Sequence, residues 1–139
     1  MYKLQTTVAG NACLESGFEV GKTGELEITL TQDLKASPEK VTVTLSNPIV
    51  AGLLALAGLP NTYIGTVTGT SINASGAGNA RTEGGCQFTP QITVAADLDR
   101  DTISGEVIWS YVATGTDCGV KSTCKTVQSF NGTRPPRVN

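Results

Sequence analysis

Apolar and polar residues alternate with a period of two in several stretches of the chain. In the first stretch the apolar side chains of Tyr2, Leu4 and Val8 are separated by polar ones, which is the pattern of a strand with one buried face. The same alternation predicts further strands over residues 26–30, 41–45, 63–72, 88–94, 103–111 and 125–130, each bounded by turn-forming residues. The pattern therefore predicts about seven or eight β-strands.

Two of these predicted strands contain glycine at interior positions, Gly65 within residues 63–69 and Gly105 within residues 102–108. Glycine weakens a strand, and in such a place it usually marks a bulge, a sharp bend or a close approach of two backbones. Strongly bent strands suit a closed barrel, which also removes the sheet edges that template aggregation. We therefore expect an all-β fold, an antiparallel up-and-down barrel of about seven or eight strands with one short helix; a two-sheet β-sandwich is the alternative.

Residues 47–60 break the alternation and predict the helix. Asn47 is a good N-cap, Pro48 suits the first helical position, Gly58 suits the position just past the end, and Pro60 prevents continuation. The segment is apolar almost all round and too short to span a bilayer, so it must be covered by the domain, a partner or a membrane surface. The residues that we expect to contact an apolar ligand or a partner are Ile49, Val50, Leu53, Leu54 and Leu56.

The remaining segments carry little periodicity. Residues 73–85 are small and mostly polar and predict a loop, and residues 134–139 predict a flexible tail. A chain of 139 residues fits one domain. We expect that single β domain to cover residues 1–133.

Four cysteines, Cys13, Cys86, Cys118 and Cys124, occur without any histidine and without a Cys-x-x-Cys pair. Zinc sites usually need such closely spaced ligands, so disulfides are the better interpretation, and they indicate an oxidising, extracytoplasmic compartment: periplasm, cell surface or medium. The first residues lack the apolar core of a signal peptide. We therefore expect that a removed segment directed export and held any lipid anchor that tethers the domain to a membrane.

Four cysteines allow three pairings, and the sequence alone does not choose among them. The five residues between Cys118 and Cys124 resemble a turn, which favours a short bridge between these two. Cys13 would then pair with Cys86 across the sheet.

Charge and side-chain chemistry exclude several classes of function. The net charge is −2 and the basic residues are scattered, which excludes a nucleic-acid partner. The absence of histidine excludes Ser-His-Asp and Cys-His nucleophiles, and we expect neither an enzyme nor a cofactor. Alternating Asp97, Asp99 and Asp101 suggest calcium, but Thr102 and Ile108 stand where an EF-hand loop needs Gly and Glu. We therefore expect a polar hairpin turn there, and no metal site.

Residues 63–72, residues 103–107 and the C-terminal part from Cys118 to Arg134 together resemble small bacterial secreted or lipid-anchored β-barrel proteins of lipocalin-like shape. The lipocalin entrance motif Gly-x-Trp does not occur, so no functional residue is carried over. The resemblance implies an extracytoplasmic barrel.

Two functional hypotheses follow from these observations. In the first, the chain is a non-catalytic binding domain that holds a small apolar ligand against the apolar helix. In the second, it is a structural or interaction subunit of an envelope or filament assembly, in which residues 48–59 dock on a neighbouring protein subunit.

Overall fold

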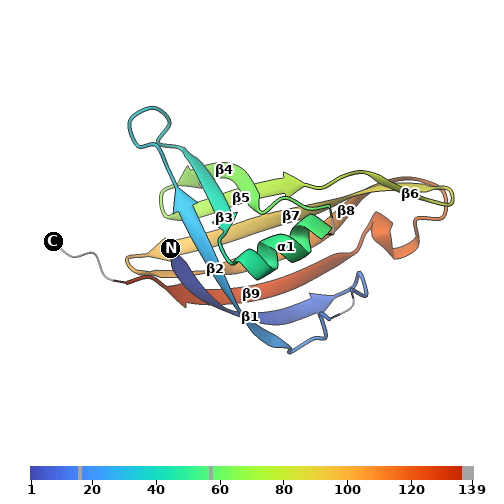
Figure 1. Cartoon of the computed structure of the whole chain (residues 1–139), viewed down its shortest axis with the longest axis horizontal. Coiled ribbons are helices and arrows are strands. Elements are labelled where there is room, and N and C mark those ends of the chain that lie inside the picture. Colours follow the sequence, from blue (N-terminus) through green and yellow to red (C-terminus); the bar gives the residue numbers. More distant parts are fainter. Residues whose placement is uncertain (16, 57, 136–139) are drawn as a thin grey trace.

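The computed structural model describes residues 1–15, 17–56 and 58–135 and contains nine strands and one α-helix (Figure 1). The elements are β1 (Tyr2–Asn11), β2 (Thr23–Thr31), β3 (Lys40–Leu45), α1 (Pro48–Leu56), β4 (Thr62–Thr68), β5 (Ser71–Ala77), β6 (Arg81–Glu83), β7 (Cys86–Asp99), β8 (Thr102–Gly115), a 3-10 turn (Gly119–Ser122) and β9 (Lys125–Thr133).

Eight of the strands form a closed antiparallel barrel, which confirms the predicted fold class and excludes the sandwich. Each strand pairs with the next in the order β1-β2-β3-β4-β5-β7-β8-β9, and β9 returns to pair with β1. The short strand β6 pairs with the start of β7, and β5 pairs with the later part of the same strand, so β6 lies beyond the end of β5 along β7. All connections join neighbouring strands, so the topology is up-and-down.

One end of the barrel is filled by its own side chains. Inward-facing residues of the strands form this core: Tyr2, Leu4, Ile28, Val41, Val43, Tyr63, Ile72, Val94, Ile103 and Phe130 are all buried. Arg134 closes this end after β9, because its Nε donates to Asp101 Oδ1 at 3.1 Å and its guanidinium lies 5.4 Å from the ring centre of Tyr2. This end of the barrel is therefore closed.

The structure corrects the sequence prediction over residues 63–85. Residues 63–72 form two strands, β4 and β5, joined by a turn at Gly69 with a φ of 61°. Residues 73–85, predicted as a loop, contain most of β5 and all of β6. Their inward positions hold small residues because larger ones oppose them: a Cβ on Gly76 would press into the Tyr63 ring. The usual apolar signal of a strand is therefore missing there.

The interior glycines mark close backbone approaches, as predicted. A Cβ on Gly65 would collide with the backbone of Asn73 and Ala74, and one on Gly105 would collide with the carbonyl of Ala95. Neighbouring strands pass too closely at these points for any side chain, and such points help a sheet to bend into a barrel.

The predicted helix and its two ends are confirmed. Helix α1 starts with a hydrogen bond from Ala51 N to Asn47 O at 2.9 Å. At its end, Gly58 has a φ of 74°, and the amides of Gly58 and Leu59 donate to the carbonyls of Ala55 and Leu54 at 3.0 and 2.8 Å. This is a Schellman motif, which ends a helix with glycine in the left-handed conformation. No helix in the described residues is long and apolar enough to cross a membrane.

Both disulfides are present, but the pairing favoured from the sequence is wrong. Cys13 bonds to Cys124, and Cys86 bonds to Cys118, each with a Cα–Cα distance of 4.9 Å. The strand register explains the first bond: Asn11 lies opposite Thr126, and continuing by two residues on each side leads to the bonded pair. The second bond joins the start of β7 to the segment after β8. Each bridge therefore joins neighbouring parts of the sheet.

Candidate functional site

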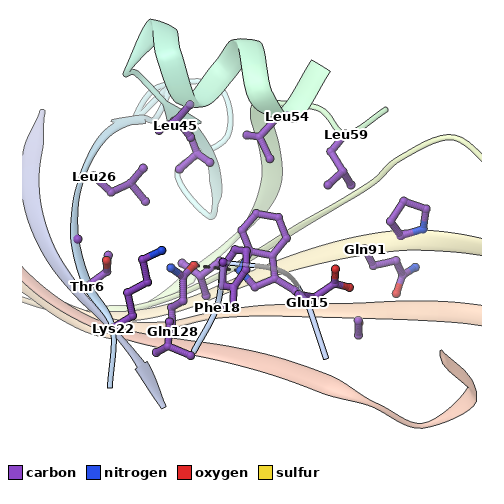
Figure 2. Close-up of a pocket in the computed structure, with 18 of the residues that line it drawn as sticks. Thr6, Glu15, Phe18, Lys22, Leu26, Leu45, Leu54, Leu59, Gln91 and Gln128 are labelled. Atoms are coloured by element: carbon purple, nitrogen blue, oxygen red, sulfur yellow. Dashed lines mark hydrogen bonds between the residues drawn. The ribbon is translucent and has the colours of Figure 1, made fainter. Parts of the chain in front are cut away.

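A cavity of about 540 Å³ lies between helix α1 and the unfilled end of the barrel (Figure 2). Strands β1, β2, β7, β8 and β9 supply most of its lining, together with α1 and the β1–β2 connection, residues 12–22. Figure 2 shows four leucines on the helix side of this cavity, Leu26, Leu45, Leu54 and Leu59. The opposite side carries Thr6, Glu15, Phe18, Lys22 and Gln128.

The β1–β2 connection is fastened at both ends over the cavity. At its start, Cys13 is bonded to Cys124. Asn11 Oδ1 accepts a hydrogen bond from the backbone amide of Glu15 at 2.8 Å, and Asn11 Nδ2 donates one to the carbonyl of Glu15 at 3.0 Å. At its end, the amide of Val8 donates to the carbonyl of Lys22 at 2.9 Å. These bonds hold the backbone at Glu15 and Lys22 in place beside the cavity.

Aromatic rings cover the floor of the cavity. Phe18 meets Trp109 edge to face with 5.6 Å between ring centres, and Phe88 meets Tyr111 at the same distance. Trp109 Nε1 donates to Gln128 Oε1 at 3.0 Å. Edge-to-face pairs add stability beyond the area they bury, so these contacts stabilise a mostly apolar floor.

A polar cluster lies where β8 meets the β1–β2 connection. The hydroxyl of Tyr111 donates to Glu15 Oε1. Burial first, and the hydrogen bond to Glu15 second, raise the pKa of Tyr111 above its ordinary value, while the charge of Arg81 opposes the shift. Tyr111 therefore stays protonated at neutral pH, and its hydroxyl donates the hydrogen bond that holds the Glu15 carboxylate in place.

The predicted apolar residues of α1 have different surroundings. Val50 and Leu54 line the cavity, and Leu54 is only 4% exposed. Leu56 points away from the cavity and is 84% exposed. The side chains of Ile49 and Leu53 lie outside the described residues.

Sequence reasoning missed most of the residues around the cavity. Trp109, Tyr111 and Gln128 stand at alternate positions of β8 and β9, so their inward direction follows once the strand register is known. Phe18 and Lys22 belong to a connection without periodicity, and no sequence signal identifies them.

The aspartates between β7 and β8 form the predicted hairpin turn. Asp99 pairs with Thr102 across the turn, and Arg100 has a φ of 56°. Two of the carboxylates accept hydrogen bonds, Asp97 from Ser71 at 2.6 Å and Asp101 from Arg134 at 3.1 Å. Within residues 1–15, 17–56 and 58–135 no group of three or more acidic, cysteine or histidine side chains is arranged to hold a metal ion.

No protein-family model matches the chain, and neither curated protein sequences nor solved structures give a significant match. The fold and the site together define a class: an eight-stranded up-and-down β-barrel with two disulfides and a cavity under a short helix. Two disulfides are consistent with an oxidising, extracytoplasmic location.

Proposed function

We propose that this protein is a non-catalytic extracytoplasmic binding protein that holds a small apolar ligand in the cavity under α1. The observation that carries the proposal is the cavity itself, whose volume of about 540 Å³ falls within the range of about 300–1,000 Å³ typical of small-molecule sites. Its apolar lining includes Val8, Leu26, Leu45, Leu54 and Trp109.

The contrast between the two ends of the barrel supports this function. Side chains fill one end, where Leu4, Tyr63 and Val43 are buried, so the chain has the means to fill a barrel. At the other end the leucines face an open space, which forfeits the dispersion contacts that a packed core provides. A ligand with an apolar body would supply those contacts, as ligands do in eight-stranded barrels of lipocalin-like shape.

The arrangement of charged groups supports a binding role without catalysis. Glu15 is the carboxylate nearest the cavity floor, and Tyr111 already occupies one of its oxygens. Glu25, the other acidic residue in the lining, accepts a hydrogen bond from Gln5 on the exposed surface. A general acid–base pair needs two groups that face the same reacting atom, and these two carboxylates are held in different directions.

A second candidate function rests on the outer surface of α1. Leu56 is 84% exposed, and Gly52 and Ala55 beside it are exposed as well. An apolar helix surface of this kind supports docking on a neighbouring subunit. Light scattering over a range of concentrations tests this alternative, with Leu56→Lys as the variant that should dissolve any assembly.

The binding proposal is tested by native mass spectrometry and by a thermal-shift screen of small apolar compounds. We expect a bound mass or a raised Tm for the natural sequence. Leu54→Trp, which fills the cavity, should abolish it, whereas Leu56→Ala on the exposed side of the same helix should leave it unchanged. A natural chain that binds none of the compounds, or a Leu54→Trp variant that binds them equally well, would refute the proposal.

A further inference from the structure

The cavity has two chemically different sides. Leu26, Leu45, Leu54 and Leu59 form an apolar side next to α1, and Figure 2 shows Lys22 entering from the opposite side, where Thr6 and Gln128 also lie. A purely hydrocarbon ligand would strip water from these polar groups and return no hydrogen bonds, which costs free energy. A ligand with one polar end and an apolar body matches both sides.

The polar side offers donors to a ligand. Trp109 Nε1 can only donate, so the oxygen of the Gln128 amide must face it, as the 3.0 Å bond shows. The Gln128 NH₂ group is thereby turned away from the indole and remains a donor of two hydrogen bonds. Lys22 carries three N–H donors and no acceptor. A ligand group that accepts hydrogen bonds is therefore favoured at this end.

The charges at this end also favour an acceptor that is negative. Lys22 forms an ion pair with Glu19 at 3.8 Å, in which both side chains are more than half exposed, and such a surface pair is weak. Among the described lining residues the carboxylates are Glu15 and Glu25. Glu15 is held by Tyr111 at the other end of the cavity, and Glu25 accepts from Gln5 on the exposed surface. The cations of the lining are Arg81 and Lys22, and the Lys22 ammonium lies on the side of Thr6 and Gln128, where the polar end of a ligand would lie.

We infer that the ligand is an anionic amphipath, a molecule with a carboxylate or a similar singly charged head and an apolar chain or ring. The head binds Lys22 and the Gln128 amide, and the body lies along the leucine side. This inference rests on the proposed binding function and adds the chemical class of the ligand to it.

The test compares three probes with the same alkyl chain: decanoate, decanol and decylamine, each titrated calorimetrically into the full chain. We expect decanoate to bind at least tenfold more tightly than decanol, and decylamine to bind most weakly. Lys22→Met should weaken decanoate binding about tenfold and leave decanol unchanged. The variant keeps the backbone carbonyl that holds Val8, so it should fold normally.

The matched control is Lys3→Met, which removes the same charge from an exposed position of β1 and should change no affinity. Equal binding of decanoate and decanol, or a Lys22→Met variant with unchanged decanoate affinity, would overturn the anionic assignment while leaving the binding function intact. Stronger binding of decylamine would overturn it as well. Failure of all three probes to bind would refute the binding function itself.

Discussion

We expect removal of either disulfide to lower the stability of the fold, but removal of only one of them to weaken ligand binding. One double variant is Cys13→Ala with Cys124→Ala, and the other is Cys86→Ala with Cys118→Ala. The sequence separations are 111 and 32 residues. By the chain-entropy relation, closing these loops destabilises the unfolded chain by about 4.8 and about 3.7 kcal/mol respectively. Either loss is a large fraction of the total stability of a typical domain, which is about 5–15 kcal/mol.

The two bonds differ more in what they hold than in these energies. Cys13 lies at the start of the β1–β2 connection, which carries Glu15, Phe18 and Lys22 to the cavity. Removing the Cys13–Cys124 bond frees this start, so the Phe18 ring should lose its fixed position on the cavity floor, while the backbone of Lys22 stays hydrogen-bonded to Val8. The Cys86–Cys118 bond lies at the far end of β7 and β8, and its loss should leave the Lys22 end of the cavity as it is.

Urea unfolding and decanoate titration of both variants measure the two effects separately. We expect both variants to lose several kcal/mol of unfolding free energy, the first about 1 kcal/mol more than the second. Only the first should lose affinity for decanoate, at temperatures where both are folded. A Cys86–Cys118 variant that is the less stable of the two, or the weaker binder, would contradict this division of roles between the two bonds.

Three further predictions concern the barrel. Gly65→Ala should cost about 1–3 kcal/mol in urea unfolding because its Cβ collides with the neighbouring backbone. Gly52→Ala, in open space on α1, should instead add about 1 kcal/mol, and equal effects would contradict the close approach. Burial raises the pKa of Tyr63, so the unfolded chain releases this proton first, and above about pH 10 this group should lower the stability by up to 1.4 kcal/mol per pH unit, in addition to the contribution of Tyr111. Tyr63→Phe should reduce that slope, and an unchanged slope would exclude Tyr63 as its source. Leu54→Ala should cost about 2 kcal/mol by denaturation, the low end for a buried leucine, because Leu54 already borders a cavity; a cost near 5 kcal/mol would mean that the site is packed.

The barrel was predictable because its signals are local. Alternation of apolar residues identifies β1, β2 and β3 from short windows of sequence, and the helix carries a cap at each end in Asn47 and Gly58. The prediction failed where a residue's environment is set by a distant partner. Ala74 is 1% exposed although it looks like a loop residue, because its strand turns it into the buried core that also contains Tyr63.

The disulfide error has the same cause. A short spacing made Cys118 and Cys124 look like partners, but the 3-10 turn at Gly119–Ser122 leads the chain from one strand to the next. Each cysteine then meets the partner that its own strand brings near. Asn11 opposite Thr126 predicts the Cys13–Cys124 bond directly, once strand pairing is known. The disulfides could have been predicted from the pairing of the strands, which the spacing of the cysteines does not reveal.

The cavity is the feature that was least predictable from the sequence, because it is built from three elements, none of which indicates a cavity by itself. The apolar helix supplies a wall through Leu54, β8 supplies Trp109, and an aperiodic connection supplies Lys22. An apolar helix can cover a full core or an empty one, and only the barrel geometry decides which. Helix α1 lies over the unfilled end of the barrel, and the charged side chain of Lys22 enters the same cavity. A helix that only sealed a core would need no ammonium across the cavity from it, and this combination is the basis of our proposal of an anionic ligand.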